Sequence, residues 1–577
     1  MIIKENVYDY KNQIYPNKIL LVLLPYWTPL IPPQGIAQIK VYLEEHGYNV
    51  KTADANVETE FKEIYQRYFN ILKKFIPKSN WGNFYNIGHD VLRNHIMAYF
   101  NHANGSSDKD TYKDLIKLLV YHTYFWNLEE EQLFQLDAVI GDFYRELNFY
   151  MLGLLEEEKP AVLGLTAHLG TLGASMFAFK LAKEKYPGIM NVVGGTIFAG
   201  ELPMSSPDFD LFLERTPFID KVIIGEGEQL FLKLLRDEFP AAQRVITMQD
   251  INGRPLDIDR VNLPDISDFE LNRYPFNAAF ISKSCPHQCR FCSVVAFFGQ
   301  FREKKISHAV DQLTELYKKH GVKLFHMLDS IANPFMTALA SELINRGLSY
   351  YMDFYMRVSD EVCDPEKTYL WRRGGLYRTR LGIETGSPNL LKAMDKGITV
   401  EQSKAAIKSL AGTGIKTTTY FVVGFPGETE EDFQQTLDFI EELKNDIWQM
   451  ECNPFYYYYA GQPEGDKWAN YRMLLYPEYA RDLLISQTWI LSCPPSREER
   501  FKRMFRLVEH CTKLGIPNPY STEEIYEADE RWKKLHENAV PSVIEFQDRG
   551  VHIDENKYVK KLIPARESLQ EDGDFAF

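Results

Sequence analysis

The chain has 577 residues, 45% of them hydrophobic, so it is long enough to bury more than one hydrophobic core and to form more than one domain. Its formal net charge of −15 disfavours nonspecific binding to nucleic acid or to an anionic membrane surface. The first residues lack the features of a signal peptide, and no apolar run approaches the ~18 residues of a membrane span. We therefore expect a cytoplasmic protein that partners neither nucleic acid nor a membrane.

Strands and helices are predicted to alternate within residues 1–240. Residues 18–25 form a continuous apolar run, which is typical of a parallel strand buried on both faces. A helix is expected to follow, with Pro33 near its start and Gly47 at its end, and residues 49–55 favour a second strand. The pattern resumes at residue 161 with three more strands. This alternation predicts an α/β fold in which a parallel sheet is doubly wound.

Two segments of this half of the chain depart from the pattern. Residues 57–150 are rich in aromatic residues at helical spacing, such as Phe61, Tyr65 and Phe69, and are predicted to be a helical insertion. Residues 241–275 contain prolines and turn formers with little amphipathic period, and are interpreted as a linker between domains.

A second alternating series is predicted for residues 276–470. Six apolar strands, each followed by a helical stretch, favour a partial (β/α)6 barrel. Residues 471–577 are charged and mostly helical in pattern, and they form no recognisable repeat. We expect this last region to belong to the substrate pocket.

Three cysteines follow the first strand of the barrel series, in the segment SKSCPHQCRFCSV: Cys285, Cys289 and Cys292. A cytoplasmic compartment keeps thiols reduced, so this cluster predicts a metal or catalytic site rather than disulfides. Three thiolates can hold a 4Fe-4S cluster by three of its irons and leave the fourth open to another ligand. The alternative is a zinc knuckle, in which His287 or a distant residue supplies the fourth ligand.

This loop resembles the C-x3-C-x2-C signature of the radical S-adenosylmethionine (radical SAM) enzymes. The resemblance implies that the open iron binds S-adenosylmethionine, whose cleavage yields a 5′-deoxyadenosyl radical. It also implies an external electron donor of the flavodoxin or ferredoxin type. Phe291 occupies the aromatic position that the family places beside the adenine.

Further positions match the family in order and spacing. Glu384 and Ser387, in GIETGSP, resemble its fourth-strand motif, and Gly424, in VVGFPGET, its fifth-strand motif. Asp329 ends the second strand, where the family often carries a polar residue facing the cofactor. The usual Gly-Gly-Glu is replaced there by MLDSIAN, which leaves the contact to the amino group of S-adenosylmethionine open. Taken singly, such residues also serve as helix caps or tight turns.

The N-terminal sheet resembles the cobalamin-binding domain that precedes many radical SAM barrels, over residues 18–56 and 160–235. The resemblance implies that glycines after the parallel strands let a corrin ring approach the backbone. The candidates are Gly194, Gly195, Gly225 and Gly227. Glycines of tight strand-to-helix turns are the alternative interpretation.

The loop after the first strand lacks the Asp-x-His-x-x-Gly motif by which other cobalamin proteins supply a histidine to cobalt. The resemblance therefore implies a cobalt without a histidine ligand from this loop. His168, just past the third strand, is a candidate to approach the corrin, although a solitary histidine more often serves packing.

Together these features predict a cobalamin-dependent radical SAM enzyme that methylates an unactivated carbon of a natural-product or peptide substrate, with S-adenosylmethionine as the source of both the radical and, through methylcobalamin, the methyl group. One alternative keeps both cofactors but ends in cyclisation or rearrangement without methyl transfer. A non-enzymatic alternative is a zinc-knuckle module or a cobalamin sensor. No individual catalytic residue is predicted.

Overall fold

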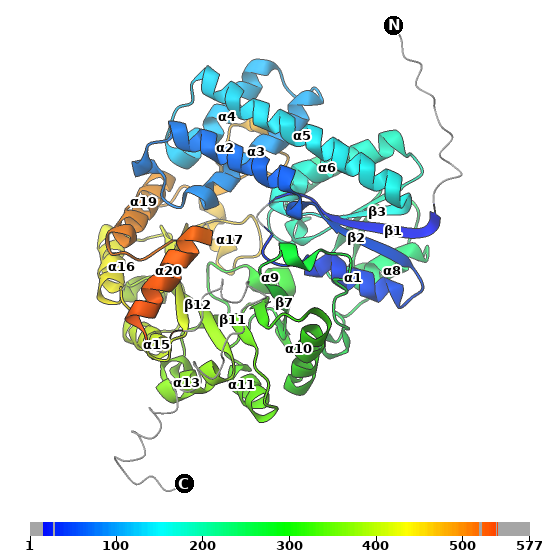
Figure 1. The fold of residues 1–577 in the computed structure, drawn as a ribbon. Helices are drawn as coiled ribbons and strands as arrows, with labels where there is room; N and C mark the ends of the chain where they lie inside the picture. The colour runs from blue at the N-terminus through cyan, green and yellow to red at the C-terminus, as the bar shows by residue number, and fades with distance from the viewer. Residues whose placement is uncertain (1–14, 27–28, 519–521, 538, 540–577) are drawn as a thin grey trace, which may run out of the picture. The chain divides into compact units, whose positions relative to one another are not determined.

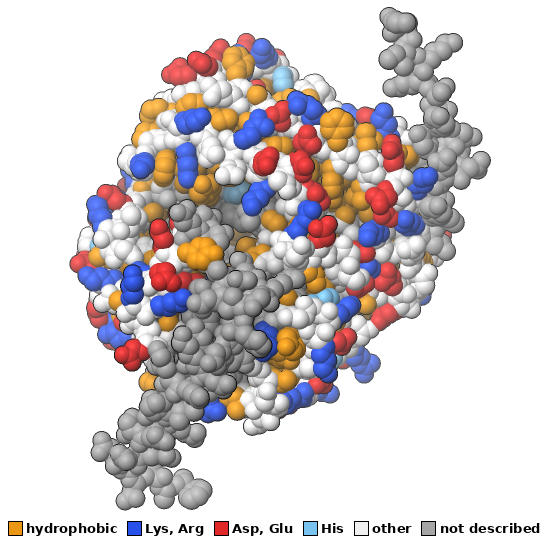
Figure 2. Space-filling view, viewed as in Figure 1, with side chains coloured by type: hydrophobic (Ala, Val, Ile, Leu, Met, Phe, Trp, Pro, Cys, Tyr) orange, Lys and Arg blue, Asp and Glu red, His pale blue; other side chains and the backbone are white. Residues whose placement is uncertain are grey.

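The computed structural model describes residues 15–26, 29–518, 522–537 and 539. They form two compact units. The first takes the described residues up to Tyr274, with Tyr458–Gly461 and Arg472–Ile490, and the second takes Pro275–Tyr457, Gln462–Tyr471 and the described residues from Leu491. No helix in these ranges combines the length and apolar character that a membrane crossing requires. The face in view in Figure 2 carries basic and acidic side chains interspersed with one another.

The first unit is built on a six-stranded parallel sheet of order β2-β1-β3-β4-β5-β6 (Figure 1). Its strands are β1 (Tyr15–Leu23), β2 (Asn49–Asp54), β3 (Pro160–Thr166), β4 (Met190–Gly194), β5 (Lys221–Ile224) and β6 (Val245–Thr247). Helices α1 (Gln34–Glu44) and α8 (Gly227–Leu235) cover one face and α6 (Leu172–Lys185) the other. The predicted doubly wound α/β fold is confirmed.

The strand order reverses at β1. The chain passes from β1 to β2 on one side and later places β3 on the other side. In open α/β sheets, ligands bind outside the carboxyl ends of the strands at such a switch point, because the two loops diverge and leave a crevice. The loops after β1 and β3 therefore mark the expected ligand position in this unit.

The predicted helical insertion is also confirmed, and it continues to residue 158. It comprises α2 (Thr59–Phe75), α3 (Phe84–Ala103), α4 (Lys109–Tyr124) and α5 (Glu130–Glu158). Its core is aromatic, as in the edge-on contact of Phe61 with Phe143 at 5.8 Å between ring centroids. These rings account for the helical spacing of aromatics in the sequence.

Residues 241–275 are not a free linker, which corrects the sequence prediction. Residues Val245–Thr247 form β6 and extend the sheet beside β5. Asp265 and Asp268 form ion pairs with Lys40 of α1 at 3.0 and 2.7 Å, and Thr52 N donates to Asp268 at 2.9 Å. Apolar residues of the segment, Ile266 and Phe269, also pack into the core of this unit, so both polar and apolar contacts hold it there.

The second unit contains the predicted partial barrel, an open parallel sheet of order β7-β10-β11-β12-β13-β14. The strands are β7 (Asn277–Ala279), β10 (Leu324–Met327), β11 (Tyr351–Arg357), β12 (Leu376–Glu384), β13 (Lys416–Val423) and β14 (Gln449–Pro454). Between them run α10 (Ile306–His320), α11 (Met336–Asn345), α13 (Pro365–Arg373), α15 (Val400–Gly412) and α16 (Glu430–Glu442).

The predicted C-terminal region 471–577 is divided between the two units, which is a second correction. Residues 472–490 belong to the first unit, where Asn101 Nδ2 of α3 donates to Leu483 O at 2.9 Å and Gln487 N donates to Asp208 Oδ2 at 2.9 Å. Helices α19 (Arg497–Lys513) and α20 (Thr522–Leu535) belong to the second unit. Residues 540–577 lie outside the described part of the chain.

Candidate active site

The three predicted thiol ligands lie on one loop of the second unit. This loop follows β8 (Ser282–Lys283), which pairs with β9 (Arg302–Glu303), and it leads into α9 (Val294–Phe298). Cys292 N donates to Cys289 O at 3.0 Å, so the chain turns between the two thiols. The loop follows β7, the first barrel strand, at the face where such folds carry their active sites.

The thiols are near enough to act on one another. Burial raises the pKa of the Cys292 thiol, and negative charge on Cys289 and Cys285 raises it further. Within the described residues, no three His, Cys, Asp or Glu side chains are arranged to hold a single metal ion. The three thiols thus lie together without converging on one point.

Asp329 accepts hydrogen bonds from the residues at the start of this loop. Its carboxylate is fully buried, and Oδ1 accepts hydrogen bonds from Ile281 N at 3.0 Å, Ser282 N at 2.5 Å and Ser282 Oγ at 2.7 Å. The structure therefore places this predicted cofactor residue against the chain's own backbone. Its position fixes where the cysteine loop begins.

The buried carboxyl of Asp329 gives a pH prediction. Burial raises its pKa to about 6, whereas an unfolded aspartate has a pKa of about 3.9. The protonated carboxyl therefore contributes its full stabilisation below about pH 4, and this contribution is lost as the pH rises through 6. The free energy of unfolding falls by about 3 kcal/mol over this interval. We expect Asp329→Asn to flatten the dependence of the melting temperature on pH in this interval. Parallel profiles for the two proteins would contradict this.

Arg357, at the end of β11, is a site residue that the sequence analysis missed. Its Nη1 lies 2.9 Å from Cys289 Sγ. Asn333 fixes the arginine backbone in both directions: Arg357 N donates to Asn333 Oδ1 at 2.9 Å, and Asn333 Nδ2 donates to Arg357 O at 2.8 Å. The segment MLDSIAN, which departs from the family pattern, thus supplies the residue that positions a cation beside a thiol.

Phe291 and Glu384 are brought together by a second missed residue, Lys396. Lys396 Nζ lies 2.5 Å from Glu384 Oε1 and 5.8 Å from the centroid of the Phe291 ring. Glu384 is buried and has a φ of 68°, a left-handed conformation that costs a non-glycine residue about 1–3 kcal/mol. Such strain is concentrated at functional sites, where the surroundings enforce it.

Ser387 and Gly424 have structural partners of their own. Ser387 Oγ donates to Asp432 Oδ1 at 2.6 Å and accepts from Leu390 N at 3.3 Å, as an N-cap of α14 (Pro388–Ala393) does. Gly424 has a φ of 77°, and a Cβ there would lie 2.0 Å from Cγ of Arg500 on α19. Only glycine fits where α19 covers the end of β13.

A ladder of polar side chains lines the barrel face opposite the helices. This polar ladder consists of His326, Asp353, Tyr355 and Arg380. Arg380 Nη2 lies 2.5 Å from Asp353 Oδ2 and 2.6 Å from His326 Nδ1, and the guanidinium stacks 4.5 Å from the ring centroid of Tyr355. Burial alone would raise the pKa of Asp353, but Arg380 and His326 hold it well below its usual range. Tyr355 is 38% exposed, so the ladder reaches an accessible surface.

In the first unit, the predicted glycines lie at the carboxyl edge of the sheet. Gly195 has a φ of 123°, and a Cβ there would lie 2.2 Å from Ala167 O, so the turn after β4 packs directly on the turn after β3. Gly225 has a φ of 112° in the turn after β5. A Cβ at Gly194 or Gly227 would meet its nearest atom at 3.5 or 3.3 Å. The tight-turn interpretation accounts for Gly195 and Gly225.

His168 lies at the same edge. Its Nδ1 is 2.8 Å from Thr196 Oγ1, and its ring centroid is 5.8 Å from that of Tyr26, which follows β1. Burial lowers its pKa, so the imidazole is neutral at neutral pH. The residue thus stands at the switch point of the sheet.

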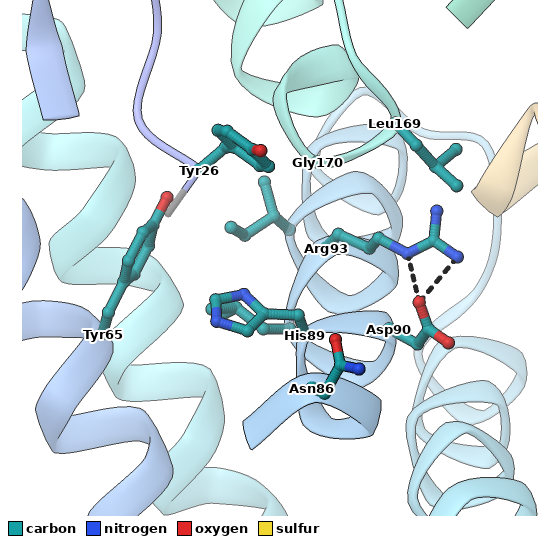
Figure 3. Close-up of a pocket in the computed structure, with 10 residues that line it drawn as sticks. Tyr26, Tyr65, Asn86, His89, Asp90, Arg93, Leu169 and Gly170 are labelled. Atoms are coloured by element: carbon teal, nitrogen blue, oxygen red, sulfur yellow. Dashed lines mark hydrogen bonds and ion pairs between the residues drawn. The ribbon is translucent and has the colours of Figure 1, made fainter. Parts of the chain in front are cut away.

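A pocket of about 190 Å³ opens beside these loops (Figure 3). Tyr26 lines it from the loop after β1, and Leu169 and Gly170 line it from the segment after β3. The insertion supplies the remaining wall: Tyr65 from α2, and Asn86, His89, Asp90, Leu92, Arg93 and Ile96 from α3. The sequence did not predict this wall of α2 and α3, because the spacing of apolar residues in the insertion does not indicate which helix packs beside the edge of the sheet.

Residues 280–440 match the model of the radical SAM superfamily. The anaerobic magnesium-protoporphyrin IX monomethyl ester cyclase of Rubrivivax gelatinosus is 29% identical over 54% of this chain and 59% of its own length. An uncharacterized methyltransferase of Pyrococcus horikoshii is 26% identical over 52% of this chain and 67% of its own length. The chain thus spans about three fifths to two thirds of these relatives.

Two solved structures share the fold over most of this chain. The radical S-adenosylmethionine methyltransferase TsrM from Kitasatospora setae, solved with tryptophan and an S-adenosylmethionine analogue, aligns with a TM-score of 0.57 and 14% identity over 96% of this chain and all of that one. The cobalamin-dependent enzyme OxsB, with aqua-cobalamin and S-adenosylmethionine bound, aligns with a TM-score of 0.50 and 15% identity over 96% of this chain and 71% of that one. The resemblance inferred from the sequence is therefore confirmed to this extent: residues 280–440 match the radical SAM superfamily, and the chain shares its fold with these two enzymes.

Proposed function

We propose that this chain is a cobalamin-dependent radical SAM enzyme that methylates an unactivated carbon of a small-molecule or peptide substrate. The observation that carries the proposal is the loop of Cys285, Cys289 and Cys292 at the active face of a parallel barrel, in a chain whose other unit opens a pocket at the switch point of a parallel sheet. One unit provides a thiolate site and the other a site for a large cofactor.

The cysteines would hold a 4Fe-4S cluster, and the edge of the first sheet would hold cobalamin; when bound, these groups supply an electron to cleave S-adenosylmethionine and a carrier for the methyl group. Asp329 fixes the start of the loop, and Arg357 places a positive charge against the Cys289 sulfur. Phe291 offers an aromatic face to an adenine, beside the Glu384–Lys396 pair. Asp329, Arg357 and Phe291 would thus position the cysteine loop and the cofactors, and none of them would form a covalent bond during the reaction.

The polar ladder suits a substrate with polar groups. Tyr355 and Tyr420 have ring centroids 5.8 Å apart, and the buried Arg380 fixes the Tyr355 ring from behind. A substrate packed on these rings would be held at the accessible edge of the barrel strands. Rigid anchoring of this kind selects one substrate carbon, because the reacting atoms must approach within about 3–3.5 Å.

The test combines composition with isotope labelling. Anaerobically reconstituted protein is expected to hold one 4Fe-4S cluster and to bind cobalamin. With methyl-labelled S-adenosylmethionine, a reductant and candidate substrates drawn from the products of neighbouring genes, label should enter the product together with 5′-deoxyadenosine and S-adenosylhomocysteine. Protein that binds neither group under these conditions would refute the proposal.

Ring closure without methyl transfer is the second candidate, favoured by the similarity to the Rubrivivax gelatinosus cyclase. The same labelling experiment separates the two. A product that forms with 5′-deoxyadenosine but carries no label establishes the second candidate.

Arg357 gives a further prediction for this site. A guanidinium 2.9 Å from a ligating sulfur stabilises negative charge there, so its removal should make a bound cluster harder to reduce. We expect Arg357→Met to lower the midpoint potential in an anaerobic redox titration followed by electron paramagnetic resonance, and Arg357→Lys to lower it less. Arg373→Met, an exposed site on α13, is the matched control. Equal potentials in all four proteins would exclude this role.

A further inference from the structure

The pocket at the switch point has one wall that no cofactor motif assigns. That wall belongs to α2 and α3 of the helical insertion and faces the loops after β1 and β3 (Figure 3). The insertion therefore completes a concave site that the sheet alone leaves open. Its chemistry is set by residues that the sequence analysis did not single out.

Most of the wall is apolar or aromatic and uncharged. The rings of Tyr26 and Tyr65 and the side chains of Leu92, Ile96 and Leu169 line the space. The Tyr26 ring packs directly against the backbone of Gly170, because a Cβ at that glycine would lie 2.5 Å from Tyr26 Cδ2. Burial and the nearby Arg93 lower the pKa of His89 to about 3, so its imidazole is neutral at neutral pH. Such a lining suits the edge of a flat, neutral ring system.

Arg93 and Asp90 are the charged residues of this lining, and they form an ion pair. Arg93 Nε and Nη2 both lie 2.9 Å from Asp90 Oδ1, so the ion pair fixes the plane of the guanidinium. The third nitrogen, Nη1, is buried and has no hydrogen-bond partner among the described residues. In Figure 3 the guanidinium lies beside Leu169 of the sheet edge. A buried donor left unsatisfied costs about 1–3 kcal/mol, so the site is complete only with an acceptor oxygen there.

We propose that the helical insertion is part of the cobalamin site, and that Arg93 Nη1 donates a hydrogen bond to an amide carbonyl oxygen at the edge of the corrin ring. This inference rests on the proposed function. A corrin carries neutral amide side chains around an apolar ring, which matches a mostly apolar wall in which Asp90 neutralises Arg93 and leaves Nη1 as a rigid donor. A space of about 190 Å³ admits one edge of so large a molecule and not the whole.

The test measures binding, not turnover. Dissociation constants for hydroxocobalamin and for cobinamide, which lacks the nucleotide tail, are measured by equilibrium dialysis on the full chain and on Arg93→Met. Loss of a hydrogen bond from a charged donor is expected to weaken both ligands by about tenfold or more. Arg67→Met is the matched control, because Arg67 lies on α2 of the same insertion, has a side chain 53% exposed and does not line the pocket. It should leave both constants unchanged.

The outcomes separate this inference from the proposed function. If the unaltered chain binds no cobalamin, the proposed function fails and the inference fails with it. If the chain binds cobalamin and Arg93→Met binds it equally well, the inference is overturned and the proposed function stands. A loss confined to cobalamin, with cobinamide unaffected, also overturns it, because the contact is then to the nucleotide tail. Should Arg93→Met not fold, Arg93→Lys, which keeps a cation beside Asp90 without the second donor, carries the same comparison.

Discussion

Replacing Cys285, Cys289 and Cys292 together with alanine is expected to abolish the iron–sulfur cluster and all reductive cleavage of S-adenosylmethionine. Under the proposed function each of the three thiolates would ligate one iron, and no other described cysteine belongs to this loop. Iron and acid-labile sulfide should fall from about four of each per chain to background after anaerobic reconstitution. The visible absorption and the electron paramagnetic resonance signal of the reduced cluster should disappear together.

Cys363→Ala is the matched control for this variant. Cys363 is partly buried on α12 (Asp360–Cys363), where its thiol donates to Gln402 O at 3.3 Å. It should keep the full cluster content. A triple variant that still holds four irons would refute the ligand assignment.

Asp529→Ala is expected to cause the largest loss of stability among these variants. Asp529 Oδ1, on α20, lies 2.6 Å from Lys416 Nζ at the start of β13, and both side chains are 1% exposed. Removing the carboxylate leaves a buried lysine without its counter-charge, which costs about 3–5 kcal/mol. Trp448 Nε1 also donates to Asp529 Oδ1, at 3.1 Å. The melting temperature measured by circular dichroism should fall by several degrees.

Two comparisons make this prediction specific. The exposed pair Lys513–Glu509, at 2.7 Å on α19, should contribute less than about 1 kcal/mol, so Glu509→Ala should hardly change the melting temperature. The double variant Lys416→Met with Asp529→Leu should recover most of the loss, because both charges are then removed from the interior. A double variant as unstable as Asp529→Ala would argue that packing of α20, not charge, dominates.

Local patterns in the sequence predicted the sheets and the cysteine loop. Continuous apolar runs such as residues 18–25 and the fixed spacing of Cys285, Cys289 and Cys292 are encoded within a few neighbouring residues, and the structure places them as expected. Gly195 was predicted as a cobalamin contact, with a tight turn as the alternative; the structure shows the turn, since a Cβ there would collide with the backbone at Ala167.

Partners that are distant in the chain could not be predicted in this way. Arg357 reaches Cys289 only because β11 ends near the cysteine loop, and Arg93 reaches the sheet edge only because α3 packs there. Asp329 and Ser387 were predicted as cofactor residues from the resemblance to the family's strand ends, but whether such a side chain turns outward or bonds to nearby groups of its own chain depends on tertiary packing. The return of residues 472–490 to the first unit has no local sequence signal.

That return has a consequence for how the protein can be divided. The polypeptide leaves the first unit after Tyr274, contributes Tyr458–Gly461 and Arg472–Ile490 to it later, and goes back to the second unit each time. A fragment cut after residue 274 would therefore lose the segment whose Leu483 carbonyl accepts from Asn101 on α3. Because segments of the two units alternate along the chain, a single crossover between two relatives could not exchange either unit whole.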